Sequence, residues 1–343
     1  MTRLVLRRGT VAEAAPPAGA EQRLVVDVPG RGPRPAIADI GLVGAAQRGD
    51  DVVVNTQAAD LALGSGGFDV VHVNLSRGLD GDGLAGAHVM KLNYSPLQHA
   101  VLPVEGPELG VPLRRPVAVI SLHGQLAPLA WAVARAQPAA RVGFVQTAGG
   151  ALPGGHSRVV ADLRARGLLA GFLTAGPAYG GEGEAITTAG AVHHGLHDLR
   201  WDAAVCGPGP GILGSASALG HGGLAALDSA HAALALGCEV VLGARMSSGD
   251  PRPRHHGLSH HARTVLELLL APVTVPVPPG CGREVPRGTG HEVLELDADV
   301  EGYAASGLPA RTMGRGLGED RLFFAAALAA GEALAAKIGR HER

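Results

Sequence analysis

The segments Val117–Leu122 (VAVISL) and Leu126–Ala136 (LAPLAWAVARA) decide the fold of this chain. The first is an apolar run of strand length with Ser121 as its one polar residue, and the second is an Ala- and Leu-rich segment of about three helical turns. A strand without polar alternation is typical of a parallel sheet that is covered on both faces. The pair therefore predicts the first strand and helix of an α/β domain.

The same alternation of strand and helix continues to the C-terminus. Further strands are expected at Arg141–Gln146, Ala170–Thr174, Asp202–Cys206, Glu239–Ala244, Pro272–Val277 and Glu292–Leu296. Further helices are expected at Ser157–Gly167, Glu184–Asp198, His221–Leu236, His260–Leu270 and Asp320–Lys337. We therefore predict a doubly wound, mostly parallel α/β sheet, whose ligands bind outside the carboxyl ends of the strands.

Residues 1 to about 110 have a different pattern, with many short strands and little helix between them. These strands are expected at Leu4–Val11, Gln22–Val28, Pro35–Ile40, Asp51–Thr56, Phe68–Leu75 and Ala87–Tyr94. Such a series predicts a small barrel. We expect a β-barrel-like domain at 1–110 and the α/β domain at 111–343, with a linker in Pro103–Pro116 and a tight turn at Gly64–Gly67.

Composition limits the partners that the chain can have. A length of 343 residues fits two domains, and 46% hydrophobic residues supply a large core. The net charge of -2 and the 3% of aromatic residues favour neither a nucleic-acid nor a membrane partner. The three cysteines are far apart, as in a reducing compartment. We expect a cytoplasmic protein, and the sequence leaves open whether it forms a homo-oligomer.

The segment Arg245–Leu266 carries the densest chemistry in the sequence. Its four histidines lie beside three of its charged side chains, and these residues are His255, His256, His260, His261, Asp250, Arg252 and Arg254. Ser259 precedes a helical pattern and is a good N-cap. His260 and His261 then lie in the first turn, where the helix dipole favours the neutral imidazole.

These residues predict a site for a small anionic molecule. Arg252 and Arg254 would bind the anion, and His256, His260 and His261 are candidates for general acid or base catalysis. A divalent metal bound by His255, His260 and Asp250 is the other occupant that the residue types allow. The spacing of His256 and His260 resembles a metalloprotease pair, but Gly257 and Ser259 break the helix that such a pair needs. The cofactor, if the protein has one, stays unknown.

Glycine-rich turns follow the other predicted strands. Their amides are candidates for holding the anion, and the residues concerned are Gly149, Gly150, Gly207, Gly209 and Gly211. Gly209–Gly214 also matches GxGxxG, but it follows the fourth strand and lacks the acidic residue expected roughly 20 positions later. An NAD(P)-dependent oxidoreductase is therefore a less favoured alternative.

Other single residues have a functional and a structural interpretation. Glu184 is an acid/base candidate, although acidic residues are common at helix starts. Arg315 is a candidate anion ligand or part of a turn that leads into the last helix. His123 and His156 lie in loops that could join the histidines, and Cys206 ends a strand without a clear base nearby.

Several motifs together resemble a bacterial family known as domain of unknown function 3866. They are Asp60–Gly67, His88–Gln98, Gly149–Pro153, Gly180–Ala185, Gly207–Gly209, Arg252–His261 and Thr312–Asp320, and they span almost the whole chain. The resemblance implies a function common to the family but assigns no catalytic residue. It also leads us to expect an acidic residue at Ala148 and a bulkier segment at Gly220–Gly223. If that acid is catalytic in the relatives, this member has an altered activity or none.

Two hypotheses follow. The first is a cytoplasmic enzyme, a hydrolase or group transferase, that acts on a small anionic metabolite at the carboxyl edge of the sheet. The second is a non-catalytic protein that binds a metabolite or takes part in an assembly.

Overall fold

The computed structural model describes residues 3–62 and 67–341 and divides into two compact units, Met1–Leu102 and Pro103–Arg343. The boundary expected near residue 110 lies slightly downstream of this division. Residues 64–66 of the tight turn predicted at Gly64–Gly67 lie outside the described residues.

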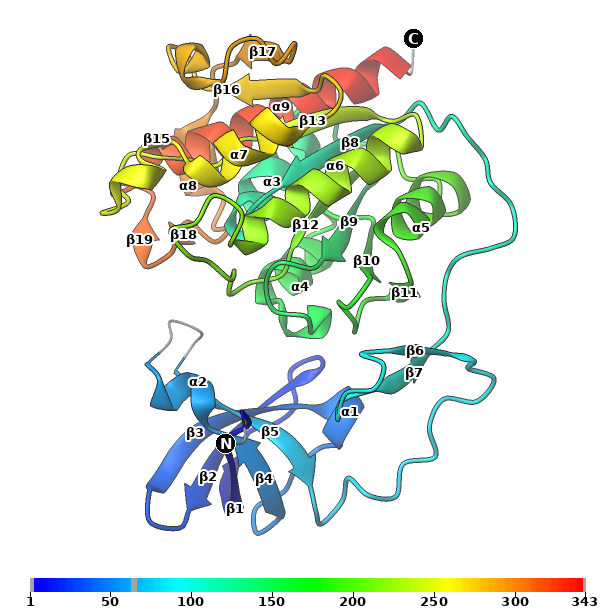
Figure 1. Cartoon of the computed structure of the whole chain (residues 1–343), viewed down its shortest axis with the longest axis vertical. Coiled ribbons are helices and arrows are strands. Elements are labelled where there is room, and N and C mark those ends of the chain that lie inside the picture. Colours follow the sequence, from blue (N-terminus) through cyan, green and yellow to red (C-terminus); the bar gives the residue numbers. More distant parts are fainter. Residues whose placement is uncertain (1–2, 63–66, 342–343) are drawn as a thin grey trace. The chain divides into compact units, whose positions relative to one another are not determined.

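The first unit is built on a closed barrel with the strand order β1-β2-β3-β5-β4 (Figure 1). The strands are β1 (Leu6–Ala14), β2 (Glu21–Val28), β3 (Gly32–Asp39), β4 (Asp51–Asn55) and β5 (Asp69–Asn74), with short helices α1 (Ile40–Val43) and α2 (Gln57–Asp60). Alternate side chains point inward, so Val26 and Val28 are buried while Asp27 is exposed. The predicted barrel is confirmed.

The last strand predicted for the barrel forms a separate ribbon. The expected strand Ala87–Tyr94 is reduced to β6 (Val89–Lys91), which pairs antiparallel with β7 (His99–Val101). Leu92 and Tyr94 have φ values of 53° and 57°. These left-handed conformations end the strand, because a side chain at positive φ cannot continue an extended ladder.

The second unit contains an all-parallel sheet of eight strands in the order β11-β10-β9-β12-β8-β13-β16-β17 (Figure 1). The strands are β8 (Pro116–Ile120), β9 (Val142–Thr147), β10 (Gly171–Ala175), β11 (Gly183–Ala185), β12 (Ala203–Pro208), β13 (Glu239–Gly243), β16 (Thr274–Val277) and β17 (Glu292–Glu295). This confirms the predicted α/β class.

Helices cover both faces of this sheet. They are α3 (Leu126–Ala136), α4 (Arg158–Ala165), α5 (Thr188–His193), α6 (Ala225–Ala235), α7 (His260–Leu268), α8 (Val300–Ala305) and α9 (Arg321–His341). Successive residues of β8 enter opposite cores: Val117 and Val119 pack on the side of α6 and α7, and Ala118 and Ile120 pack on the side of α3. This is why β8 is apolar throughout.

Two-residue strands and single turns complete the unit. The short strands are β14 (Met246–Ser247), β15 (Gly257–Leu258), β18 (Arg311–Thr312) and β19 (Arg315–Gly316). Turns of 3₁₀ helix lie at His123–Gln125, Gly154–His156, Gly222–Leu224, Pro253–His255 and Gly282–Glu284. Most of these pieces lie in the loops that follow the carboxyl ends of the strands.

The topology places these loops at a switch point of the sheet. The helix after β8 packs on one face, and the helices after its neighbours β12 and β13 pack on the other. Neighbouring strands whose connections leave to opposite faces open a crevice at their carboxyl ends, where ligands of such folds bind. The loops after β8, β12 and β13 meet there.

The helix predicted over Glu184–Asp198 is wrong at its N-terminal end. Glu184 belongs to the edge strand β11, and its carboxylate accepts hydrogen bonds from Thr174 Oγ1 (2.7 Å) and the Gly180 amide (2.6 Å). Helix α5 begins only after Thr187, whose hydroxyl accepts from the Gly190 amide. A π-helical turn at His194–Asp198 ends it.

Helix α9 is the longest in the described part of the chain. Its length and composition would suffice to span a membrane, but 72% of the apolar window of Arg321–Arg340 is buried inside the protein. Buried core helices have the same composition, and α9 packs closely against α3.

Candidate functional site

The loop between β13 and α7 is closed by a short ribbon. Met246 and Ser247 of β14 pair antiparallel with Leu258 and Gly257 of β15, so both ends of the loop leave from one place at the carboxyl edge of the sheet. Ser259 then caps α7, because its hydroxyl accepts a hydrogen bond from the His261 amide. The predicted N-cap is confirmed.

Four imidazoles meet at this point, and we call them the histidine cluster: His221, His255, His260 and His261. The rings of His221 and His261 are stacked, with centroids 3.8 Å apart and planes at 12°. His260 lies 4.4 Å from His261 and 5.3 Å from His221, and His255 lies 4.9 Å from His260. His221 comes from the β12–α6 loop and the other three from the β13–α7 segment.

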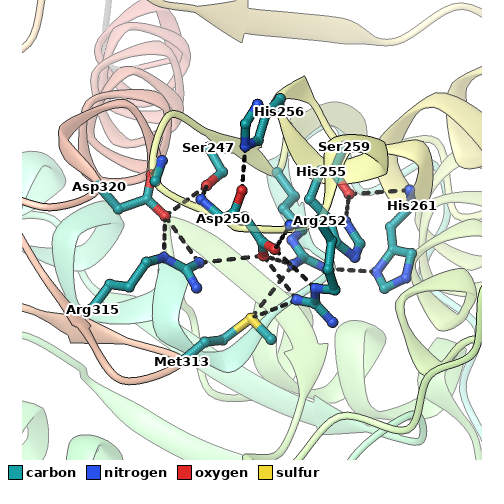
Figure 2. Close-up of polar contacts among 12 residues, drawn as sticks. Ser247, Asp250, Arg252, His255, His256, Ser259, His261, Met313, Arg315 and Asp320 are labelled. Carbon is teal, nitrogen blue, oxygen red and sulfur yellow. Dashed lines mark hydrogen bonds and ion pairs between the residues drawn. The ribbon is translucent and has the colours of Figure 1, made fainter.

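A network of buried and partly buried charges lies beside His255 and His261 (Figure 2). We call it the arginine network; it consists of Arg245, Asp250, Arg252, Arg315 and Asp320. Asp250 is fully buried and accepts two hydrogen bonds of 2.8 Å from the Arg252 guanidinium. Arg315 joins the two acids, with Nε 3.0 Å from Asp320 and Nη2 3.4 Å from Asp250.

Asp320 fixes the start of the loop to this network. Its carboxylate accepts from the Ser247 hydroxyl at 2.7 Å and from the Ser248 amide at 2.8 Å. The neighbouring Gly249 amide donates to it as well. Both acids thus use their oxygens inside the network, and each has a lowered pKa; burial opposes this shift, and the hydrogen bonds from arginine, serine and backbone groups outweigh it.

Arg245 connects the network to the histidine cluster. Its side chain is 2% exposed, and it donates through Nη1 to His261 Nδ1 at 2.9 Å. Its Nη2 lies 3.4 Å from an Asp250 carboxylate oxygen. Burial lowers the pKa of Arg245 to about 10, so it stays charged at neutral pH.

The cluster is electrically neutral near pH 7. Burial, together with the positive charge of Arg245, lowers the pKa of His261 to about 2 and that of His255 to about 3. Burial is also the largest cause that lowers the pKa of His260, and the nearby His221 and Arg254 lower it further. For His221, burial lowers the pKa more than the nearby Ala218 carbonyl raises it.

Three ring nitrogens of the cluster have no partner among the described residues. They are Nδ1 and Nε2 of His221 and Nε2 of His260, and all three atoms are buried. The Ala218 carbonyl is near enough to affect the pKa of His221 but is not placed for a hydrogen bond. A buried polar atom without a partner is destabilising by about 1–3 kcal/mol, so these nitrogens mark a place for a polar ligand.

A metal ion does not fit this arrangement well. One nitrogen from each of His221, His260 and His261 lies within 4.8 Å of the others. The stacked rings of His221 and His261 are nearly parallel, so their lone pairs do not converge on one ion. His261 Nδ1 already accepts from Arg245, and the guanidiniums repel a cation.

The metal ligands expected from the sequence are not brought together as a set. His260 belongs to the group of three histidines, but His255 and Asp250 do not. The Asp250 oxygens bind arginine, and His255 Nδ1 lies 2.7 Å from the Ser259 hydroxyl.

A second histidine group lies beside α5, next to a hollow of about 150 Å³. There, one nitrogen of His193 and one of His197 lie within 4.8 Å of Asp198. The Gly110 amide donates to His193 Nε2, and His194 and His197 both bond to the Asp198 carboxylate. These contacts account for the group as a surface network.

The glycines of the rim loops pack against one another. A Cβ at Gly150 would lie 2.2 Å from the Gly209 carbonyl oxygen, and one at Gly149 would lie 2.3 Å from the Gly222 oxygen. Gly207 and Gly209 are equally confined, whereas Gly211 has open space and a φ of 66°. Their role in anion binding stays a prediction, because close backbone contact already explains most of these glycines.

The remaining candidates are not members of the cluster. Arg254 and His256 are exposed, and His256 Nε2 meets the Asp250 carbonyl. His123 donates through Nδ1 to the Pro208 carbonyl and accepts at Nε2 from the Ser157 hydroxyl. Cys206 is fully buried, which raises its pKa and argues against a nucleophile. Glu184 accepts hydrogen bonds from Thr174 and from the Gly180 amide of its own loop.

The sequence interpretation missed His221, Arg245 and Asp320 as parts of the site. Arg245 lies two residues after the end of β13, and His221 lies in the connection that follows β12, so both stand where strand ends predict ligand contacts. Their proximity to the other residues arises from tertiary packing, which spacing along the chain cannot show.

Comparison with known proteins identifies the family of this chain. Neither the curated proteins nor the solved structures contain a match to this chain. A family model described as protein of unknown function (DUF3866) matches residues 35–331. This range includes the end of the barrel sequence, every strand of the parallel sheet and the whole histidine cluster. The chain therefore belongs to the DUF3866 family.

Proposed function

We propose that this protein is an enzyme that transfers a group from a small oxyanionic metabolite, to water or to another acceptor, at the histidine cluster. One observation carries the proposal. His221 is 7% exposed, and neither of its ring nitrogens has a partner among the described residues. A ligand that hydrogen-bonds to it would remove this destabilisation.

The charges around the cluster favour an anion. The arginine network has three guanidiniums and two carboxylates, which leaves one net positive charge beside the imidazoles. Arg254 adds a cation that makes no ion pair among the described residues, and its charge reaches His260. A positive potential with neutral N–H donors attracts an oxyanion and disfavours a cation.

The same groups can assist a reaction. Preorganised N–H donors stabilise negative charge that develops on oxygen in the transition state. His260 is the half-buried member of the cluster and is our candidate for proton transfer. A bound anion cancels part of the positive potential that lowers the pKa of His260, and this would bring the ring closer to the range needed for acid/base work.

We also propose the compartment and the partners that the sequence predicts. Its low net charge and few aromatic residues argue against nucleic-acid and membrane partners, and its three separated cysteines support a cytoplasmic protein. A homo-oligomer remains compatible with the proposed site.

Turnover assays with purified protein test the proposal. The substrates are a panel of phosphate esters and carboxylic acid derivatives, and the variants are His260→Ala and His261→Ala. His231→Ala is the matched control, since His231 lies on α6 in the same unit and accepts a hydrogen bond from the Leu270 amide. We expect at least a hundredfold loss of kcat/KM in the first two variants and little change in the control.

A non-catalytic binding protein is the second candidate, and one observation favours it. The buried carboxylates of Asp250 and Asp320 are occupied by arginines, and the low pKa values of His255 and His261 make them poor bases. An oxyanion that binds to the wild type and is lost in His261→Ala, with no turnover of any substrate, would establish this candidate and contradict the enzyme.

A further inference from the structure

The buried guanidinium of Arg245 contacts a histidine, His261, more closely than it contacts the acid Asp250. Asp250 already receives two 2.8 Å hydrogen bonds from Arg252, while its distance to Arg245 is 3.4 Å. The short contact of Arg245 is the one to His261 Nδ1, at 2.9 Å. Placing a guanidinium inside the protein is costly, so this contact indicates a specific use of the charge.

The contact determines which ring nitrogen of His261 carries hydrogen. A guanidinium has five N–H donors and no acceptor, so His261 Nδ1 must accept through its lone pair. The single proton of the neutral ring then lies on Nε2. A second proton on Nδ1 would face the guanidinium N–H directly, so the same contact disfavours the imidazolium.

We infer that Arg245 is a positioning residue that holds His261 as a neutral Nε2–H donor, and that the ligand of the histidine cluster is an oxyanion that accepts this hydrogen bond. Among the described residues, no acceptor is found for His261 Nε2–H. A nitrogen that carries hydrogen cannot ligate a metal, which agrees with the nearly parallel rings of His221 and His261.

Ser259 makes a short contact with the His255 ring. The Ser259 hydroxyl accepts from the His261 amide at 3.3 Å and lies 2.7 Å from His255 Nδ1. The hydroxyl can donate to Nδ1 or accept from it, so this contact fits either tautomer of the neutral His255 ring. His261 is thus the imidazole that is preset as a donor, whereas His221 and His260 have unpartnered nitrogens that can adapt to the ligand.

The oxyanion part of the inference rests on the anion binding in the proposed function and not on turnover, and the part about Arg245 rests on neither. Nuclear magnetic resonance of protein with ¹⁵N-labelled histidine separates the two. Correlation of ring nitrogens with ring carbon-bound protons distinguishes the tautomers, and His261→Gln assigns the signal. We expect wild-type His261 to be protonated on Nε2 alone, without titration between pH 6 and pH 8.

Arg245→Met should release this constraint. The His261 signal should then report a mixture of tautomers and begin to titrate, while Arg252→Met, the control, should leave the tautomer unchanged because Arg252 contacts Asp250 and not the ring. A His261 protonated on Nδ1 in the wild type overturns the positioning role, and this spectrum needs no variant to fold. An unchanged His261 signal in folded Arg245→Met overturns it as well.

Titration with inorganic phosphate tests the oxyanion. We expect phosphate to shift the His261 Nε2 signal in a saturable manner, with half-saturation at least tenfold higher in Arg245→Met. If the tautomer is as inferred but phosphate leaves His261 unaffected, the oxyanion part is wrong and the positioning role stands. If phosphate binds but no substrate is turned over, the enzyme is wrong and both parts of this inference stand.

Discussion

At the scale of single residues, His221 and His123 form a matched pair. Both are buried histidines with 7% of the residue exposed, and both stand in loops at the carboxyl edge of the parallel sheet. Both ring nitrogens of His123 are hydrogen-bonded, whereas those of His221 have no partner among the described residues. Buried polar atoms of a purely structural residue are normally hydrogen-bonded, as those of His123 are. The unpartnered nitrogens of His221 therefore point to ligand binding.

Replacing each by leucine should therefore have opposite effects. In protein freed of small molecules, His221→Leu should raise the free energy of unfolding by about 1 kcal/mol, because it removes unsatisfied nitrogens. His123→Leu should lower it by about 1–3 kcal/mol, because it leaves the Ser157 hydroxyl and the Pro208 carbonyl without their partner. Urea denaturation measures both. A destabilised His221→Leu would mean that the nitrogens of His221 are satisfied in solution.

The chemistry of several residues was predictable from the sequence. Ser259 before an apolar helical pattern indicated the N-cap, and the neutral state expected for His260 and His261 agrees with their lowered pKa values. The dipole argument named the wrong main cause, since burial and Arg245 contribute most at His261. No spacing rule joins His221 to residues 34 or more positions away, so the cluster itself could not be predicted.

At the scale of elements, the rim loops are interlocked through their backbones. Residues after β9 press against those after β12 and before α6, so that carbonyl oxygens occupy the space where a side chain would begin. The glycine-rich turns quoted for the family resemblance thus position the loops that surround the site. This packing accounts for glycine without any ligand, and the binding role of the loop amides is a separate question.

Gly150→Ala and Gly211→Ala distinguish close contact from backbone conformation. A Cβ at Gly150 meets the Gly209 oxygen at 2.2 Å, so a loop must shift, and we expect a loss of about 1–3 kcal/mol or more of stability. Gly211 has open space, and only its positive φ penalises alanine, by about 1 kcal/mol. Thermal and urea unfolding of the two variants measures this. Equal losses would contradict the interlocked loops.

The loop after β8 should make stability depend on pH. Burial lowers the pKa of His123 from 6.5 to about 4, so the folded protein holds it neutral while the unfolded chain takes up a proton. Stability is therefore lost as pH falls below 6.5 toward 4, by about 2 kcal/mol between pH 7 and pH 5.

His123→Gln removes this titration and serves as the comparison. The difference in unfolding free energy between wild type and variant should shrink by that amount as the pH is lowered to 5. Parallel stability curves would show that His123 titrates normally. The other buried histidines titrate in both proteins and cancel in the difference.

Elements with strong periodic patterns were predictable, and those set by tertiary contacts were not. Leu126–Ala136 is helical over the predicted range, because its apolar residues pack against α9 in the core on one face of the sheet. Glu184 was placed at a helix start, yet β11 forms there because its backbone pairs with β10. The ribbon of β14 and β15 has only two residues in each strand, too few for any periodicity to appear.

At the scale of the whole molecule, the chain consists of two units with separate hydrophobic cores. The barrel encloses its own core of valine, leucine and alanine side chains, and the parallel sheet has one core on each face. Separate cores allow separate cooperative unfolding. The site residues all belong to the second unit, so its stability determines whether the site survives.

The positions of the tryptophans make separate unfolding of the two units testable. Both tryptophans, Trp131 and Trp201, lie in the second unit, so tryptophan fluorescence reports only its unfolding. Far-ultraviolet circular dichroism reports both units. We expect the two denaturation curves to differ in midpoint, with the dichroism showing two steps. Coincident single transitions would mean that the units unfold together.

The central claim is that the histidine cluster binds an oxyanion through neutral N–H donors and does not bind a metal. Crystals soaked separately in zinc and in inorganic phosphate, with the zinc soak measured at the zinc absorption edge, test it most directly. We expect phosphate density with an oxygen about 3 Å from His261 Nε2 and no anomalous peak in the cluster. A zinc peak at about 2.0–2.1 Å from nitrogens of His221 and His260 would contradict it.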